Sequence, residues 1–291
     1  MAACPELCVG TSGFAFDDWR TAVYPELLPK PQWLTYYEHV LGFNALEVNY
    51  TYYQMPSPRT MHSLLRKTTD RFRFTIKTHR SMTHEIIQAD GSIHDNPAAF
   101  EQFRQGLRPL TDSGKLCCVL AQFPYAFTNT PEAWSYLETA IDRLADLALV
   151  IEFRHKSWMA PETLARLRRR GVGLCAVDEP ALPQLMPWVD EPTSELGYVR
   201  FHGRNAQDWF GTSTAQRYNY SYSDGQLREL QSRLDALRGK VKTLMVFFNN
   251  CHGGAAAKNA RQFASMLHAA GWPAASSTGA PALQSEFFPS P

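Results

Sequence analysis

Ionisable and amide side chains gather toward the ends of several strand-like segments of this sequence. In residues 71–79, Thr75, Lys77 and His79 alternate with bulky apolar residues. Because successive side chains of a strand point to opposite faces, these three are expected to share one face. Comparable positions in other strand-like segments carry Glu47, Asn49, Thr51, Gln122, Glu152, Arg154, Asp178, Arg200, His202 and Asn249.

Burying so many charged groups costs free energy unless they pair, so the set as a whole favours a functional pocket over a purely stabilising core. For any single pair the alternative is structural. Lys77 can neutralise Glu47, and Arg154 can neutralise Glu152, as parts of an ion-paired plug.

These residue types suit general acid/base chemistry, because nearby cations hold carboxylates ionised. The predicted catalytic residues are Glu47, Lys77, Glu152, Asp178 and His202. Lys77 is expected to be a permanent cation that holds an anion. The alternative is an amine whose pKa is lowered by neighbouring arginines and which forms a Schiff base.

The three carboxylates, taken with His79 or His202, would also suit Zn, Mn or Mg. However, the sequence contains no HExxH motif and no paired-ligand spacing. The lysine and arginines of the same face would repel a cation. No metal ligands are therefore predicted, and the pattern points to no particular cofactor or oligomeric state.

Two glycine-containing loops are candidate anion sites. Gly10-Thr11-Ser12-Gly13 ends the first strand-like segment and offers amides and two hydroxyls, although a tight turn alone explains it as well. Gly253-Gly254 follows the last strand-like segment and begins a predicted helix, where free N–H groups favour anions. Arg200 and Arg204 can add bidentate contacts, although Arg204 can equally be solvated. We therefore predict an anion site at the loops that follow the seventh and eighth strands.

Aromatic residues are frequent, and most are expected to pack in the core. Trp19, Tyr53 and Trp158 stand just beyond strand-like segments, so they are predicted to contact substrate.

The elements that must position these residues alternate along the chain. Strands are predicted at 7–13, 45–53, 71–79, 115–123, 147–154, 173–178, 197–203 and 242–250. Helices are predicted at 31–41, 57–68, 97–110, 131–145, 161–170, 226–237 and 255–269. The connection 179–196 is proline-rich and has no helical pattern. The sequence thus predicts an α/β fold, a single (β/α)8 TIM-like barrel with an irregular sixth βα unit. The barrel is expected over residues 5–272, and residues 273–291 are expected to form a disordered or loosely docked tail.

Composition limits the class of protein. The 291 residues include 29 Lys and Arg against 28 Asp and Glu, a formal net charge of +1. This balance argues against a strongly basic nucleic-acid-binding surface. Six scattered cysteines, no secretory signal and no apolar run long enough to cross a membrane predict a soluble, cytoplasmic protein with reduced thiols.

A series of ordered motifs runs along nearly the whole chain, from Val9 to Leu267. They are Gly10-Thr11-Ser12-Gly13, Trp19, Tyr24-Pro25, Glu47-Val48-Asn49, Thr51-Tyr52-Tyr53, Pro56, Phe72-Arg73-Phe74, Lys77, Thr83-His84, Glu152-Phe153-Arg154-His155, Ser157-Trp158, Val177-Asp178-Glu179-Pro180, Val199-Arg200-Phe201-His202-Gly203-Arg204, Tyr218–Tyr222, Phe248-Asn249-Asn250 and Asn259-Ala260. In these motifs the chain resembles a known family, the YecE-like proteins of domain-of-unknown-function family 72.

The resemblance implies a TIM-like barrel with these residues at its mouth, and it supplies no reaction. It implies a site role for His84 rather than His79. The sequence departs from the family pattern at Phe14, Lys156 and Cys251-His252. The last departure affects the expected anion geometry of the loop after the eighth strand.

We therefore expect an enzyme, a hydrolase or lyase, that binds an anionic phosphorylated or sugar-acid substrate at the barrel mouth. The alternatives are a nucleic-acid-processing or nucleic-acid-binding protein that takes a base or single strand into the mouth and a non-catalytic ligand-binding protein. The predicted substrate-binding residues are Thr11, Ser12, Trp19, Asn49, Tyr53, His84, Arg154, Trp158, Arg200, Arg204, Asn249, Asn250, Gly253 and Gly254.

Overall fold

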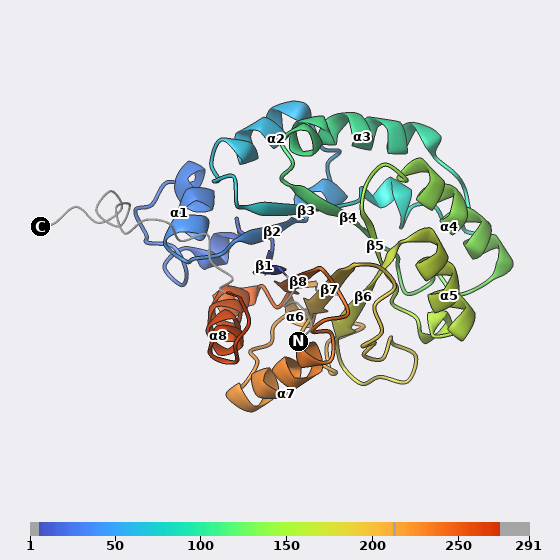
Figure 1. Cartoon of the computed structure of the whole chain (residues 1–291). Coiled ribbons are helices and arrows are strands. Elements are labelled where there is room, and N and C mark those ends of the chain that lie inside the picture. The colour runs from blue at the N-terminus through green and yellow to red at the C-terminus, as the bar shows by residue number, and fades with distance from the viewer. Residues whose placement is uncertain (1–5, 212–213, 274–291) are drawn as a thin grey trace, which may run out of the picture.

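The structure is a computed structural model that describes residues 6–211 and 214–273. Eight parallel strands follow one another around a closed barrel in sequence order (Figure 1). Strand β1 (Glu6–Ser12) pairs with both β2 (Ala45–Val48) and β8 (Thr243–Phe248), which closes the ring. The strands between them are β3 (Arg73–Lys77), β4 (Leu116–Gln122), β5 (Leu149–Glu152), β6 (Gly173–Asp178) and β7 (Leu196–Phe201). The predicted fold class is confirmed.

The helices lie outside the barrel (Figure 1). They are α1 (Trp33–His39), α2 (Pro58–Leu65), α3 (Pro97–Asp112), α4 (Pro131–Arg143), α5 (Pro161–Arg170), α6 (Thr214–Arg217), α7 (Asp224–Asp235) and α8 (Ala255–Ala269). Local sequence sets where several of them begin. Ser57, Asn96 and Thr130 each accept a hydrogen bond from the amide three residues on, and a proline follows each at the first helical position. Proline is tolerated there because that N–H has no helical partner.

The sixth βα unit is irregular, as the proline-rich connection predicts. Strand β6 leads to β7 without a helix among residues 179–195, and α6 and α7 both follow β7. Strand β2 is shorter than predicted, because a 3-10 turn at Tyr50–Tyr52 ends it. The hydroxyl of Thr51 donates to the carbonyl oxygens of Val48 and Lys77, which fixes this turn against β3.

Strand side chains divide between an apolar layer under the helices and a polar interior toward the mouth. On β7, Phe201 packs on Phe263 of α8, with ring centroids 5.4 Å apart, whereas Tyr198 and Arg200 point into the barrel and bind its carboxylates. The alternation that the sequence shows therefore becomes the division between core and site.

None of the helices described is both long enough and apolar enough to cross a bilayer. The tail predicted for residues 273–291 lies outside the described residues, apart from Pro273.

Candidate functional site

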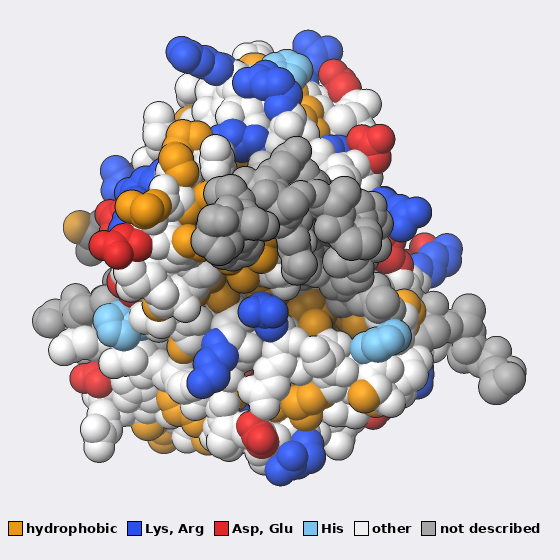
Figure 2. Space-filling model, turned by 90° about the vertical axis from the view of Figure 1, so that its left-hand side faces the viewer, with side chains coloured by type: hydrophobic (Ala, Val, Ile, Leu, Met, Phe, Trp, Pro, Cys, Tyr) orange, Lys and Arg blue, Asp and Glu red, His pale blue; other side chains and the backbone are white. Residues whose placement is uncertain are grey.

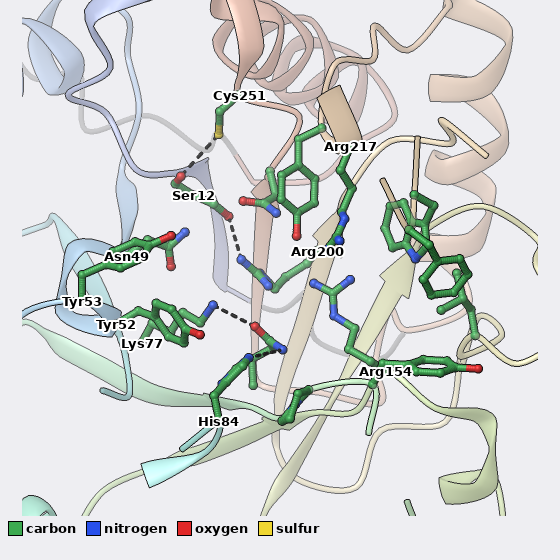
Figure 3. Close-up of a pocket in the computed structure, with 18 of the residues that line it drawn as sticks. Ser12, Asn49, Tyr52, Tyr53, Lys77, His84, Arg154, Arg200, Arg217 and Cys251 are labelled. Atoms are coloured by element: carbon green, nitrogen blue, oxygen red, sulfur yellow. Dashed lines mark hydrogen bonds between the residues drawn. The ribbon is translucent and has the colours of Figure 1, made fainter. Parts of the chain in front are cut away.

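A cavity of about 470 Å³ opens where the strands end at their carboxyl termini, and Figure 3 shows it from close by. Residues at or beyond the ends of all eight strands form its walls. Its described lining residues are Ser12, Phe16, Asn49, Tyr52, Tyr53, Lys77, His84, Gln122, Pro124, Tyr125, Arg154, Leu185, Arg200, Trp209, Phe210, Arg217, Tyr218, Asn249 and Cys251.

Arg200 lies at the floor of the cavity and is almost completely buried. Its Nη1 donates to Oε2 of Glu152 at 2.6 Å, and its Nη2 donates to Oε1 of Glu47 at 2.7 Å. The other oxygen of Glu47 accepts a hydrogen bond from the Tyr198 hydroxyl at 2.7 Å. Burial alone would lower the pKa of Arg200, but the two carboxylates outweigh it and hold this pKa well above the usual range. Arg200 is therefore a permanent, fixed cation.

Arg154 enters the cavity from the end of β5. Its Nε lies 2.6 Å from Oε1 of Glu152, and its Nη1 donates to Oε2 of Glu179 at 3.0 Å. The indole ring of Trp209 packs against the guanidinium, 5.8 Å from centroid to Cζ. Two carboxylates and one aromatic face thus fix this second cation.

The two carboxylates bound to Arg154 differ in their acidity. Burial disfavours the charged form of both. In Glu152 the positive charges of Arg154 and Arg200 outweigh burial and hold the pKa well below its usual range. In Glu179 burial dominates the attraction of Arg154 and raises the pKa to about 7.

Lys77 is the third cationic group, at the end of β3. Its Nζ donates to Oε1 of Gln122 at 2.8 Å and lies 4.5 Å from the centroid of the Tyr52 ring. Burial, followed by the positive charge of Arg200, lowers the pKa of Lys77 to about 7. A substantial fraction of this amine is therefore neutral near physiological pH.

His202 lies beneath the lining residues and is fully buried. Its Nε2 is 3.3 Å from Oε1 of Glu152, and its Nδ1 is 2.9 Å from the amide nitrogen of Asn249. Since an amide nitrogen can only donate, Nδ1 accepts and Nε2 carries the proton toward Glu152. Burial and the charge of Arg154 lower the pKa of His202 to about 3, so the ring is neutral.

Positively and negatively charged side chains lie in separate layers at this site. The described lining includes Lys77, Arg154, Arg200 and Arg217 and contains no Asp or Glu, while Glu47 and Glu152 lie beneath and are fully buried. A molecule in the cavity therefore meets the cations first and the carboxylates behind them. In Figure 3 the ends of Lys77, Arg154, Arg200 and Arg217 are directed toward the same space.

The structure brings many predicted site residues to this place. Those that line the cavity are Ser12, Asn49, Tyr53, Lys77, His84, Arg154, Arg200 and Asn249. Glu47, Glu152 and His202 lie directly beneath and support them through the contacts described above. Of the two histidines weighed from the sequence, His84 lines the cavity, whereas Nδ1 of His79 accepts from the Ser81 amide and caps a 3-10 turn.

Asp178 and Arg204 do not join the mouth, and their predicted placement is wrong. Cys175 Sγ lies 3.9 Å from Glu152, so the side chain of Asp178, three residues further along β6, points outward. There Arg204 donates to both oxygens of Asp178 at 2.7–3.0 Å and also to Glu229 of α7. Both residues belong to an ion cluster outside the barrel.

Four further residues predicted to bind substrate are buried in packing that supports the mouth. Trp158 stacks on Phe153, 4.1 Å between ring centroids, and its Nε1 donates to the Phe127 carbonyl. The other three each make hydrogen bonds that hold a loop: Trp19 Nε1 to the Cys251 carbonyl, Thr11 Oγ1 to the Gly13 carbonyl, and Asn250 Nδ2 to the Tyr220 carbonyl. The size of the indole rings explains their burial, because large aromatic surfaces gain most from leaving water.

The amide of Gly253 already has an anionic partner. It donates to Oδ2 of Asp18 at 2.7 Å, and neither Gly253 nor Gly254 is among the residues that line the cavity. The predicted anion site at this helix start is therefore occupied by a side chain of the protein itself. The left-handed φ values of 59° and 79° explain why glycine stands at both positions.

The sequence predictions missed several residues that line the cavity. Trp209, Phe210 and Arg217 come from the long segment after β7, and Tyr125 follows β4. Tyr52 and Tyr218 also line the cavity, and both belong to motifs that the family resemblance implied at the mouth. The high density of aromatic residues in these loops was the one sequence feature that could have pointed to the missed residues.

Across the described residues, no three His, Cys, Asp or Glu side chains come together in a way that would hold a metal ion.

Comparison with known proteins agrees with the fold. Residues 8–284 match the family described as protein of unknown function DUF72. The UPF0759 protein YunF of Bacillus subtilis (strain 168) is 29% identical over 271 residues, covering 89% of this chain and 94% of YunF. The crystal structure of a DUF72 family protein, TM1631, from Thermotoga maritima MSB8 is similar, with a TM-score of 0.84, 42% identity, and coverage of 90% of this chain and 99% of that one. The DUF72 family protein EF0366 of Enterococcus faecalis V583 gives a TM-score of 0.77 at 26% identity, with coverage of 90% and 95%.

Proposed function

The chain belongs to the DUF72 family, and we propose that its barrel mouth binds a small anionic substrate, phosphorylated or a sugar acid, on which it acts as a hydrolase or lyase. The layering of charge carries this proposal. The described lining of the cavity presents lysine and arginine groups without a carboxylate, and the carboxylates that balance them stand behind, out of contact with the cavity.

The arginines are suited to hold an anion because they are already fixed. Arg200 and Arg154 are held by Glu47, Glu152 and Glu179, so little side-chain entropy remains to be lost on binding. Within the described chain, Nη2 of Arg154 has no hydrogen-bond partner and is free to donate to a ligand. Charge-assisted hydrogen bonds of this kind are the stronger ones in proteins.

Lys77 is the residue best placed to move a proton in this cavity. General bases work best when their pKa lies near the working pH, and the pKa of Lys77 is about 7. Glu47 and Glu152, expected from the sequence to transfer protons, are fully occupied by Arg200, Arg154 and Tyr198. We assign them a positioning role instead.

A thermal-shift comparison tests the anion site. Phosphorylated metabolites, sugar acids and nucleotides are screened against the wild-type protein, Arg154→Gln and Lys156→Gln. Lys156 is exposed and does not line the cavity, so it serves as the charge-matched control. A ligand that stabilises the wild type and the control but not Arg154→Gln supports the proposal, since a ligand at 100 times its Kd adds about 2.7 kcal/mol. No stabilisation by any anion, or an equal shift in Arg154→Gln, contradicts it.

A second candidate is binding of a nucleic-acid base. The exposed rings of Tyr53 and Phe210 at the cavity favour it, since 68% and 62% of their surface is accessible and bases stack on such rings. The charge balance opposes it, because the formal net charge is only +1 and Figure 2 shows both signs of charge spread over one face. Anisotropy of a labelled single-stranded oligonucleotide decides between them. Binding that weakens steeply with added salt supports this candidate, and no binding at low salt removes it.

A further inference from the structure

We infer that Lys77 is a covalent site for carbonyl compounds, forming a Schiff base with the aldehyde or ketone group of a substrate that also carries a carboxylate or phosphate. This inference rests on the proposed function and specifies the substrate class of the same cavity. It depends on what surrounds the Lys77 amine.

The hydrogen-bond partner of Lys77 is neutral and fixed. Nζ of Lys77 donates to Oε1 of Gln122 at 2.8 Å, and Nε2 of Gln122 donates to the Phe123 carbonyl at 2.6 Å. The second bond sets the orientation of the amide, so its oxygen must face the amine. Among the described residues, no carboxylate forms an ion pair with Lys77. An amine with an amide partner can become neutral without breaking an ion pair.

The surroundings also favour the neutral amine. The Tyr52 ring attracts a positive charge at Nζ, but Arg200 on the cavity floor repels one. Together with burial this lowers the pKa of Lys77 to about 7. An ordinary lysine, with a pKa of about 10.4, is neutral in only about one molecule in 2,500 at pH 7. Lysines that attack carbonyl groups need this change, because only the unprotonated nitrogen is a nucleophile.

The arginines meet the second requirement of the site, which is to bind the carboxylate or phosphate of the substrate. Arg154 and Arg200 line the same cavity as Lys77, and Figure 3 shows all three directed into it. A carboxylate or phosphate bound at the guanidinium groups would hold the rest of a small molecule beside Nζ. Such positioning raises the effective concentration of the carbonyl group at the amine. A 2-oxo acid, in which carbonyl and carboxylate are adjacent, meets both requirements with the fewest atoms.

The step conserves atoms and charge. The neutral amine adds to the carbonyl carbon, the C=O π bond breaks, and the oxygen leaves as water after taking up protons. Overall, the lysine ammonium and the carbonyl compound give a protonated imine and one water. No electrons are gained or lost. The protonated imine then withdraws electrons from the adjacent carbon, which favours the cleavage of a bond to that carbon, as in a lyase.

His84 is a neutral neighbour of the Lys77 amine. Its Nε2 lies 3.5 Å from Nε2 of Gln122, and its ring packs edge-on to Tyr52 with centroids 4.8 Å apart. Burial and the charge of Lys77 lower the pKa of His84 to about 3, so the ring is neutral and adds no positive charge beside Nζ. Its Nδ1 is 2.9 Å from the Thr83 hydroxyl, which holds the ring in place.

Reductive trapping tests the inference on the full chain. The protein is incubated at pH 7 with pyruvate, glyoxylate or dihydroxyacetone phosphate, reduced with sodium borohydride, and analysed by intact mass and peptide mapping. We expect one adduct per chain, located at Lys77, and at least tenfold more modification there than at the exposed Lys156. Lys77→Arg is expected to lose the adduct, and Lys156→Arg to keep it. Far-UV circular dichroism shows whether each variant is folded.

A matched pair of anions separates this inference from the proposed function. Lactate resembles pyruvate but lacks the carbonyl group, so it tests anion binding alone and is expected to compete with trapping. Trapping no greater at Lys77 than at Lys156 with all three carbonyl probes overturns the inference. If lactate, dihydroxyacetone phosphate or another anion still stabilises the protein and Arg154→Gln abolishes that shift, the anion-binding proposal stands alone. If no anion binds either, both fail. Peptide mapping in the wild type decides the matter even if Lys77→Arg does not fold.

Discussion

Arg200 and Arg204 stand four residues apart at the end of β7, yet they serve two different ion clusters. Arg200 points into the barrel and binds Glu47 and Glu152 beneath the cavity. Arg204 binds Asp178 and Glu229 outside the barrel, where the Tyr222 hydroxyl also donates to Asp178 at 2.7 Å. The residue types are the same, but Arg200 lies within β7, whereas Arg204 lies beyond the end of the strand at Phe201. Strict alternation would place both arginines on one face, but the left-handed φ of 87° at Gly203 breaks the alternation and lets Arg204 turn outward.

The two clusters differ in burial and in whether they border a cavity. The side chains of Arg200, Glu47 and Glu152 are at most 2% exposed, whereas Arg204 is 24% and Glu229 43% exposed. The inner cluster borders a cavity and includes Arg154, which keeps a donor free. The outer cluster ties β6 to α7. We expect perturbation of the inner cluster to affect both stability and ligand binding, and perturbation of the outer cluster to affect stability alone.

The largest expected effect is that of Arg200→Met. The substitution leaves Glu47 and part of Glu152 buried without a countercharge, and breaking a buried ion pair from one side costs about 3–5 kcal/mol. The free energy of unfolding, measured with urea, should fall by that amount, and anion binding should be lost. Adding Glu47→Gln should restore part of the stability by removing one unpaired charge. A loss below about 1 kcal/mol for Arg200→Met would show that the network adds little to the fold.

The next effect is a dependence of stability on pH. Native Lys77 releases its proton near pH 7, whereas the unfolded chain keeps it to about pH 10.4. Between these values the unfolded state binds more protons, so stability should rise with pH, by up to about 1.4 kcal/mol per unit.

Glu179 should change stability in the opposite direction below pH 7. Its native pKa of about 7 exceeds the unfolded value near 4.3, so stability should fall as pH rises through that window.

Two variants assign these slopes. Lys77→Met should remove the rise between pH 7 and 9, and Glu179→Gln should remove the fall between pH 5 and 7, both measured by urea unfolding at each pH. Each variant is the control for the other, because each should keep the slope that the other loses. Parallel profiles for Lys77→Met and the wild type above pH 7 would mean that Lys77 is charged in the folded protein.

A smaller effect is expected from Arg204→Met in the outer cluster. Its partners Asp178 and Glu229 lose a contact, but Glu229 is solvated and Asp178 keeps the Tyr222 hydroxyl. We expect a loss of about 1–3 kcal/mol in the free energy of unfolding, because Asp178 itself is buried. Anion-induced thermal shifts should be unchanged. A selective loss of ligand binding with normal stability would place Arg204 functionally in the mouth and remove the distinction between the clusters.

Much of this architecture can be read from the sequence, because local rules set it. The helices 161–170 and 255–269 begin and end where predicted, and the absence of a helix after β6 follows from its prolines. The inner residues Lys77 and Glu152 follow from alternation along β3 and β5. Asp178 was misplaced because alternation fixes which residues share a face, not which face is inside. That choice depends on the register with β7, where Asp178 is opposite Phe201.

Trp209 and Phe210 could not be predicted for a different reason. Both line the cavity from a loop after β7 that lies outside any strand or helix, and no periodicity of the sequence predicts the path of such a loop. Contacts made by the loops also explain why Trp19 and Trp158 are buried. Both stand beyond a strand, as Tyr53 does, but each finds a carbonyl for its indole N–H and a ring to pack against.

Tyr53→Ala is expected to change the free energy of unfolding least of these variants. It therefore tests ligand binding with little effect on folding. Its ring is 68% exposed and borders the cavity, with the Tyr52 ring edge-on at 4.9 Å. Tyr53→Ala should change the free energy of unfolding by no more than about 0.5 kcal/mol, as surface substitutions usually do. If a bound ligand stacks its own ring on Tyr53, the variant should bind that ligand about 5- to 150-fold more weakly, since such stacking contributes about 1–3 kcal/mol.

Titrations of inorganic phosphate and of a nucleoside monophosphate against the wild type and Tyr53→Ala show whether Tyr53 stacks on a ligand ring. Phosphate binding should be unaffected, because the anion contacts the arginines alone. Equal weakening for both would mean that Tyr53 acts by shaping the cavity rather than by stacking.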